Sequence, residues 1–217
     1  MRSARLARLD PSSRERLIEV AIRHFGAEGF ERASLNRIIA EAGIGKSSYY
    51  YYFDDKRALL IEAMRAAVES VSADVPYPDP PKTKPRFWPT LETHMQQMVR
   101  AVQARPHLLA FFGKLPHAEM RGPQFDSLRA RGRELYLPML RAGQALGCVR
   151  RDVALETLAE VWEAADMVLD HAVVRDAITP ARMAAHASIA FDMFRRVFEE
   201  TPASAKRAPA RSQKKGA

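Results

Sequence analysis

The chain has 217 residues, of which 47% are hydrophobic and 28% charged, and its formal net charge is +8. This size suits one core, or a small domain joined to a larger one. No apolar run reaches the roughly 18 residues that a membrane-spanning helix needs, and no hydrophobic segment of a secretory signal follows the N-terminal arginines. The single cysteine, Cys148, excludes an intramolecular disulfide. We therefore expect a cytoplasmic protein that does not enter a membrane.

The positive charge is concentrated at the two ends of the chain. Residues 1–60 contain eleven Lys and Arg against eight Asp and Glu, and the last fifteen residues contain five cations and no acid. The sequence between them therefore has no net charge. This distribution permits a polyanionic partner such as DNA. Residues 202–217 are predicted to be a disordered basic tail, which is either simply solvated or a DNA clamp.

The first helix is predicted from a capping pattern. Residues 1–11 are expected to form a flexible basic arm, and Ser12 followed by Glu15 matches the capping box that marks a helix start. Apolar side chains then recur at helical spacing as far as Phe25. Gly29 is placed to end this helix in a left-handed conformation.

Three further helices are expected before residue 75. Ser34 can cap the second, which Gly43-Ile44-Gly45 interrupts after about two turns. The third is predicted from about Lys46 to Phe53. Asp54 can cap the fourth.

A cluster of prolines separates these short helices from longer ones. Proline at this density cannot continue a helix, so residues 76–89 are predicted to be an extended connection. Longer helices are then predicted near 90–104, 106–113, 123–146, 153–174 and 180–199. The sequence thus predicts an all-α protein.

The stretch from Ser34 to Phe53 has the plan of a helix-turn-helix. A short capped helix is followed by a tight glycine turn and by a second short helix. The second helix of such a unit enters the major groove with its N-terminal residues towards the base edges. Small or flexible side chains suit that position, and this helix begins with Lys46, Ser47 and Ser48.

The run from Ala42 to Phe53, followed by Lys56 and Leu59, resembles the signature of the TetR (tetracycline-repressor-like) family of regulators. In that family Ala-Gly-Val-Ser precedes a basic or polar residue, a small pair, an apolar residue, Tyr, two variable residues and Phe, and then Lys and Leu. Upstream positions also agree, namely Ala21, Phe25, Gly29, Ser34 and residues 38–40. The sequence departs from the pattern in that Gly45 replaces a Ser or Thr cap, Tyr52 replaces a frequent His, and the tyrosine run 49–52 is unusual.

The resemblance implies a three-helix helix-turn-helix domain, which we place at residues 12–60, and a larger helical effector-binding and dimerisation domain at 61–201. It implies a homodimer that binds a palindromic DNA operator. Bases would be faced by Lys46, Ser47 and Ser48, phosphates would be bound by Tyr50, Tyr52 and Lys56, and Ser34 would lie near the DNA backbone. A basic arm can follow the adjacent minor groove through Arg2, Arg5 and Arg8.

The remaining aromatic residues of the third helix are interpreted separately. Tyr49 and Phe53 are one turn apart and are predicted to belong to the core. Tyr51 is either on a solvated face or in contact with a phosphate.

For the larger domain, the resemblance implies a small-molecule pocket and a dimer interface formed by the last two long helices. Apolar side chains repeat at helical spacing in 153–174 and 180–199, which suits such an interface. Candidate pocket residues are His94, Met98, Phe111, Phe112, Tyr136 and Trp162. We expect a repressor that a small, largely apolar effector releases from DNA.

No enzyme motif is present. The six histidines and one cysteine show no close metal-ligand spacing, and Gly45-Lys46-Ser47 is no P-loop because Ala40 occupies the place of its first glycine. We expect no catalytic activity, no metal and no cofactor. The alternative to a regulator is a helical dimer that binds a ligand or a protein without specific DNA binding.

Overall fold

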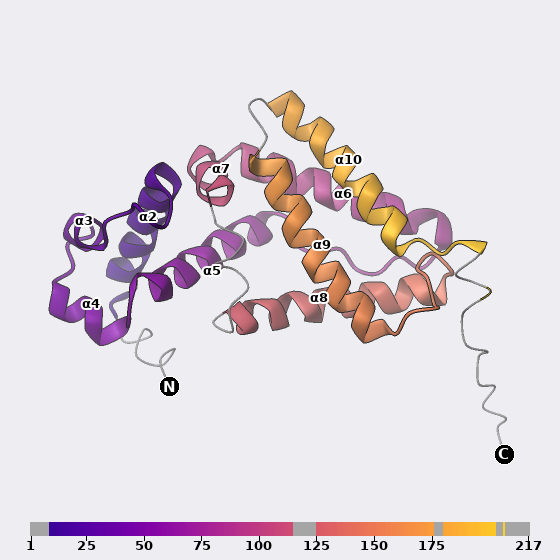
Figure 1. Cartoon of the computed structure of the whole chain (residues 1–217), viewed down its shortest axis with the longest axis horizontal. Coiled ribbons are helices and arrows are strands. Elements are labelled where there is room, and N and C mark those ends of the chain that lie inside the picture. Colours follow the sequence, from indigo (N-terminus) through magenta and orange to yellow (C-terminus); the bar gives the residue numbers. More distant parts are fainter. Residues whose placement is uncertain (1–8, 115–124, 176–179, 203–205, 207–217) are drawn as a thin grey trace, which may run out of the picture.

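A computed structural model describes residues 9–114, 125–175, 180–202 and 206. These residues form an elongated assembly of helices, with α2 to α5 at one end (Figure 1). Within them the only β pairing is an isolated bridge between Val149 and Glu199, so the all-α prediction is confirmed. No helix in these ranges is long and apolar enough to cross a membrane. The helices are α2 (Pro11–Glu28), α3 (Leu35–Glu41), α4 (Lys46–Tyr52), α5 (Lys56–Asp74), α6 (Lys84–Gln103), α7 (Pro106–Gly113), α8 (Asp126–Ala145), α9 (Leu155–Arg175) and α10 (Pro180–Phe198).

Helix α2 begins earlier than its capping pattern predicts. Asp10 is the N-cap, because its carboxylate accepts a hydrogen bond from the Ser13 amide at 3.0 Å. Pro11 occupies the first helical position, where its fixed φ is favourable and its missing N–H costs nothing. The prediction of Ser12 as the cap was wrong, since its hydroxyl instead donates to Asp10 at 2.6 Å.

The start of α5 also differs by one residue. Asp55, and not Asp54, is the N-cap, and its carboxylate accepts from the Ala58 amide at 2.8 Å. Helix α5 then runs without interruption to Asp74. The predicted domain boundary between residues 60 and 61 therefore falls inside a continuous helix, which extends from the N-terminal end into the rest of the molecule.

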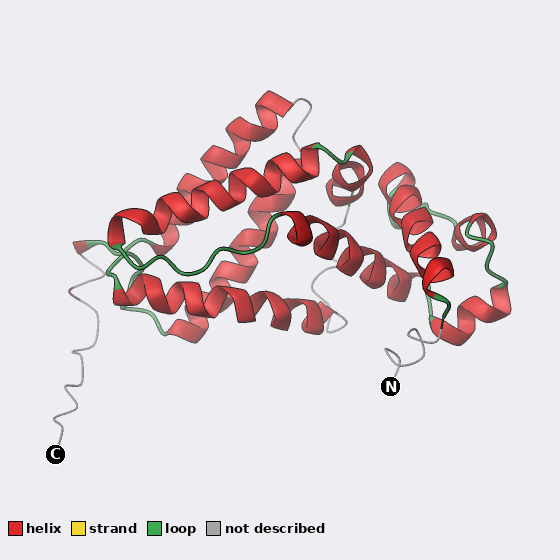
Figure 2. Cartoon of the chain, turned by 180° about the vertical axis from the view of Figure 1, so that it is seen from behind, coloured by secondary structure: helices red, strands yellow, loops and turns green. Residues whose placement is uncertain are grey.

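The proline-rich connection is shorter than predicted. It is the long loop seen between α5 and α6 in Figure 2, and α6 begins at Lys84. Pro85 lies in the first turn, where helices tolerate proline. Pro89 lies inside α6, where burial of the two preceding residues, Phe87 and Trp88, outweighs its poor helix propensity. The extended prediction was thus wrong for residues 84–89.

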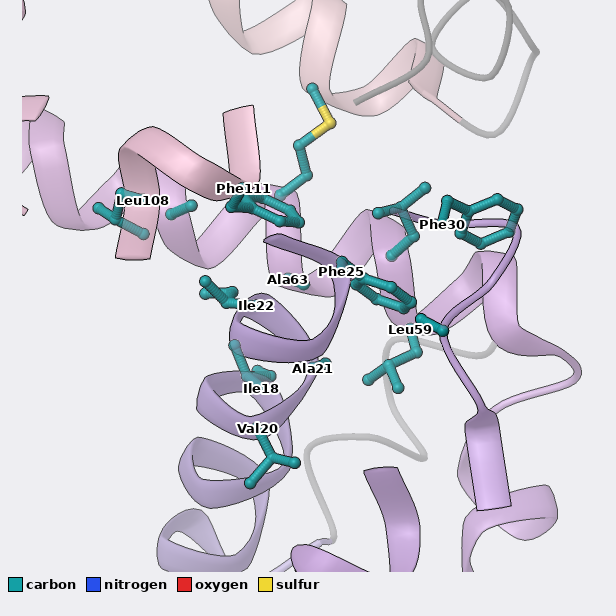
Figure 3. Packing of buried hydrophobic residues seen from close by; sticks show 14 of the residues in the cluster. Ile18, Val20, Ala21, Ile22, Phe25, Phe30, Leu59, Ala63, Leu108 and Phe111 are labelled. Atoms are coloured by element: carbon teal, nitrogen blue, oxygen red, sulfur yellow. The ribbon is translucent and has the colours of Figure 1, made fainter. Parts of the chain in front are cut away.

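Two clusters of buried side chains hold the helices together. The first joins α2, α3, α4 and α5 to α7 and to the first half of α10, and part of it is shown in Figure 3. The second joins α6, α8, α9 and the second half of α10. Helix α10 belongs to both, through Met183, Ala187 and Ala190 in the first and through Phe191, Phe194 and Phe198 in the second.

Helices α2 and α7 meet at an unusually close seam. A Cβ atom added to Gly26 would lie 3.0 Å from the backbone nitrogen of Phe111. The rings of Phe25 and Phe111 are adjacent, with centroids 6.5 Å apart (Figure 3). In addition, the ammonium of Lys114, the residue after α7, donates to the carbonyl of Ala27 in α2 at 2.5 Å. Glycine at position 26 thus allows α7 to pack directly on the backbone of α2.

Candidate nucleic-acid interface

The turn between α3 and α4 is a Schellman motif centred on Gly43. Gly43 has φ 73°, a left-handed conformation that glycine adopts without strain. Its amide donates to the Ala40 carbonyl at 3.1 Å, and the Ile44 amide donates to the Ile39 carbonyl at 2.9 Å. This turn ends α3 abruptly, and α4 can begin only three residues later with Gly45 as its N-cap.

One face of α4 is anchored in the protein core by Tyr49. This side chain is completely buried, its ring stacks on Phe53 with centroids 5.0 Å apart, and its hydroxyl donates to the Asp55 carbonyl at 2.7 Å. Burial raises the pKa of Tyr49, because the ionised phenolate would be poorly solvated there. The prediction that Tyr49 and Phe53 belong to the core is confirmed. The anchor fixes which face of α4 points outward.

The outward face of α4 carries the side chains expected to read DNA. Lys46, Ser47 and Ser48 are all exposed in the first turn, and Tyr50 and Tyr51 each expose about half of their surface. Helices α3 and α4 lie at the end of the molecule remote from α10 (Figure 1), so no other described helix covers this face. The face can therefore approach a large flat or grooved partner.

Ser34 and Tyr52 flank this face in half-buried positions. The Ser34 side chain caps α3 by accepting from the Arg37 amide at 3.4 Å, as predicted from the sequence. Its own hydroxyl hydrogen is left to donate elsewhere. Tyr52 stands edge-on against Tyr51, with centroids 5.0 Å apart. The structure thus brings all seven predicted DNA contacts to one end of the molecule, six of them on or beside this face.

The seventh, Lys56, is engaged within the chain. Its ammonium donates to the carbonyl oxygens of Glu31 and Ala33 at 3.0 and 3.1 Å, and it lies 4.7 Å from the ring centroid of Phe30. Lys56 is therefore bonded to the loop that precedes α3.

Sequence reasoning missed a charged cluster that joins α2 to α3. His24 is buried on α2 with the apolar side chains of that helix, but both of its ring nitrogens face carboxylates. Nε2 lies 2.7 Å from Glu41 and Nδ1 lies 3.3 Å from Glu28. Hydrogen bonds from His24 and then Arg23 lower the pKa of the exposed Glu41 carboxyl to about 2. The His24–Glu28 pair, four residues apart, was visible in the sequence, whereas the partner on α3 was not.

The predicted basic segments lie outside the described residues. This holds for Arg2, Arg5 and Arg8 of the arm, and for residues 203–205 and 207–217 of the tail.

The candidate effector residues fall into two groups. The ring of Tyr77 meets His94 edge-on and Tyr136 at a tilt, and Tyr136 is adjacent to Trp162, so these side chains form one aromatic row with centroid separations of 5.0 to 6.0 Å. His94 also lines a surface groove of 420 Å³ beside the proline-rich connection. The second group contacts the first cluster: Phe111 is fully buried in it, and Met98 and Phe112 pack against it.

Helix α10 presents an apolar stripe that sequence reasoning only partly identified. Within residues 180–199, the range expected at the dimer interface, Val197 is exposed, whereas Phe191 and Phe194 are buried in the chain's own core. The exposed stripe continues instead through Ile189 and Met193, which expose 60% and 55% of their surface. Val161 of α9 is exposed as well. The side chains of residues 166–175 lie outside the description.

Among the described residues no three His, Cys, Asp or Glu side chains are grouped as a metal site would need. The interface on α4 is instead built from hydroxyls, one ammonium and amide groups at a helix start.

Comparison with known proteins identifies the N-terminal unit. Residues 17–63 match the family described as bacterial regulatory proteins, tetR family. This range contains α3, α4 and the turn between them. No protein of curated function is similar enough in sequence to count as a match.

Solved structures share the fold over most of the chain. A tetR family protein from Shewanella sp. PV-4 superposes with a TM-score of 0.63 at 18% identity, covering 88% of this chain and 99% of that one. A regulator from Marinobacter aquaeolei VT8 gives 0.58 at 21%, covering 93% and 100%. SmeT, the repressor of the Stenotrophomonas maltophilia multidrug efflux pump SmeDEF, gives 0.59 at 16%, covering 87% and 91%. At these identities the likeness establishes the fold.

Proposed function

We propose that this chain, a tetR family protein by its N-terminal domain and its fold, is a homodimeric, cytoplasmic repressor that binds a palindromic operator and leaves it when a small effector binds. The observation that carries the proposal is the exposed first turn of α4. Its small and basic side chains point outward because Tyr49 is buried behind them. This is the arrangement that a recognition helix needs in order to enter the major groove.

Within that interface we assign two kinds of contact. Lys46, Ser47 and Ser48 face base edges, since they stand at the N-terminus of α4. Phosphate contacts come from Tyr50 and Tyr52, and from the Ser34 hydroxyl beside the start of α3. Tyr51, which is as exposed as Tyr50, extends the same surface.

The dimer is proposed to form through α9 and α10. Ile189, Met193 and Val197 are spaced one helical turn apart and together leave an apolar stripe open on α10. A second copy of the chain is the partner that such a stripe fits in this fold, because paired helices from two protomers bury it on both sides. Each dimer would then present two α4 helices about one DNA turn apart, roughly 34–36 Å.

The effector is proposed to bind along the aromatic row of His94, Tyr136 and Trp162. The row is connected to the first cluster through α6, the helix that contains His94. On this helix Met95 packs against both clusters and Met98 packs against the first. In that cluster Phe111 on α7 packs against Phe25 of α2, and Phe112 packs against the same cluster. A ligand that favours a different spacing of the two α4 helices must weaken DNA binding, and DNA must weaken ligand binding equally.

Selection of bound duplexes from a random pool tests the proposal with the full-length protein. We expect a palindrome whose half-sites are centred about 10 base pairs apart. Affinity for the selected duplex should fall steeply as salt rises. Lys46→Ala should reduce discrimination between selected and random duplexes. A pool that shows no enrichment would support the alternative of a helical ligand- or protein-binding dimer.

A further inference from the structure

A positive charge at the position of Lys56 is electrostatically unfavourable unless the ammonium has partners that stabilise it. It is the first residue of α5, where the partial positive charge of the helix N-terminus disfavours a cation. Its side chain does not extend away from the helix. Two of the three ammonium hydrogens are directed at the carbonyl oxygens of Glu31 and Ala33, and the charge lies over the face of Phe30.

The loop that Lys56 contacts determines where α3 begins. Ala33 is buried, and the residue that follows it, Ser34, is the N-cap of α3. Phe30 is also buried and packs against Phe25 of α2. Hydrogen bonds from a charged donor are stronger than those between neutral groups. The Lys56 ammonium thus fixes the start of α3 relative to both α2 and α5.

The neighbouring residue, Asp55, performs the corresponding task for α4. Its carbonyl accepts the hydrogen bond from the buried Tyr49 hydroxyl, and its carboxylate caps α5. Two consecutive residues at the start of α5 therefore hold both helices of the helix-turn-helix. Any rotation of α5 moves the loop before α3 and the anchor of α4 together.

We infer that Lys56 is a positioning residue of the DNA-binding unit: it ties the α2–α3 loop to the first turn of α5, and its charge is used there and not on a DNA phosphate. The inference rests on the proposed function, because the resemblance to the family implies the opposite role. Positioning and phosphate binding leave different signatures, so the two can be separated.

The test compares Lys56→Met, which keeps the alkyl chain over Phe30 but has no donor, with Lys82→Met. Lys82 is exposed in the proline-rich connection and controls for the loss of one positive charge. Hydrogen–deuterium exchange on the full-length protein without DNA should be roughly tenfold faster at the hydrogen-bonded amides of Ala33 and of residues 37–39 in Lys56→Met, and unchanged in Lys82→Met. Unchanged exchange in Lys56→Met overturns the inference.

Salt titration of binding to the selected duplex gives the second readout. The quantity compared is the slope of the logarithm of the DNA-binding constant against the logarithm of the salt concentration, and we expect it to be the same in Lys56→Met and Lys82→Met. If the magnitude of this slope were smaller by about 0.9 per protomer in Lys56→Met alone, a phosphate contact would have been lost, and the inference would be overturned whatever the exchange data show. If Lys56→Met does not fold, Lys56→Gln, whose side-chain amide keeps N–H donors but carries no charge, replaces it. If the wild type binds no duplex, the proposed function fails, and the exchange experiment alone decides the role of Lys56.

Discussion

The N-terminal helices α2–α5 and the longer helices α6–α10 are stabilised in different ways. In the first group, helix ends are determined by local chemistry: Asp10, Ser34 and Asp55 cap helices, and Gly43 ends one. In the second group, α6, α7 and α8 begin without a side-chain cap. There, large aromatic side chains such as Trp162 and Phe194, with centroids 4.5 Å apart, determine how the helices pack.

This difference reflects two requirements. A recognition helix must be short, exposed and fixed in direction, so α4 buries only one side chain and depends on its turns for orientation. The body that would bind an effector and a second copy needs broad apolar surfaces instead. The two regions nevertheless share α10, which belongs to both clusters, and the close seam between α2 and α7.

The largest expected effects test whether the two regions unfold together. Phe25→Ala in the first cluster and Phe87→Ala in the second should each cost about 3 to 5 kcal/mol, because both side chains are fully buried. Both tryptophans, Trp88 and Trp162, lie in the second cluster, so their fluorescence reports that region alone. Since α10 is shared, Phe25→Ala should shift the denaturant transition seen by tryptophan fluorescence as much as the one seen by circular dichroism. A dichroism curve with two steps and an unmoved fluorescence midpoint would show two independent units.

The seam between the regions is tested by Gly26→Ala. The new methyl group would lie 3.0 Å from a backbone nitrogen of α7, which cannot move without the whole helix. We expect a loss of about 1 to 3 kcal/mol in the free energy of unfolding, despite the better helix propensity of alanine. Gly132→Ala in α8 is the matched control, because its nearest neighbours at 3.3 Å are atoms of the partly exposed Tyr136 side chain, which can shift. Equal stability changes in the two variants would show that α7 does not pack closely on α2 at Gly26.

The same contrast explains what the sequence could and could not predict. Local signals identified the fold class, the cap at Ser34, the glycine turn at 43 and the buried role of Tyr49, because each depends on residues close by in the chain. The extension of α6 through Pro89 depends on burial of Phe87 against other helices, which no local pattern contains. For the same reason, the partner of Lys56, a loop more than twenty residues earlier, was not predictable.

A smaller, pH-dependent effect is expected at the charged cluster between α2 and α3. The pKa of Glu41 is lowered from near 4.5 to about 2, so its ionised form stabilises the fold above about pH 4.5 and this contribution is lost as the pH falls towards 2. Glu41→Gln should therefore lower the melting temperature at pH 7, and the difference from wild type should shrink steadily between pH 4.5 and 2. Glu19→Gln, which changes an exposed carboxylate on α2, controls for net charge. A difference that stays constant down to pH 2 would contradict the role given to His24 and Arg23.

The smallest expected effect concerns the one helix of the N-terminal group whose N-cap lacks a side chain. Gly45 has φ −66° and ψ 144°, which any residue can adopt, and a Cβ there would meet nothing closer than the Ser48 side chain at 3.8 Å. Gly45→Ser should add a cap hydrogen bond to α4 and stabilise the protein by a few tenths of a kcal/mol. Chemical denaturation should show this gain, and affinity for the selected duplex should not fall, since the serine hydroxyl would bond to amides within α4. A loss of affinity with unchanged stability would show instead that the backbone at Gly45 approaches the DNA too closely to allow any side chain.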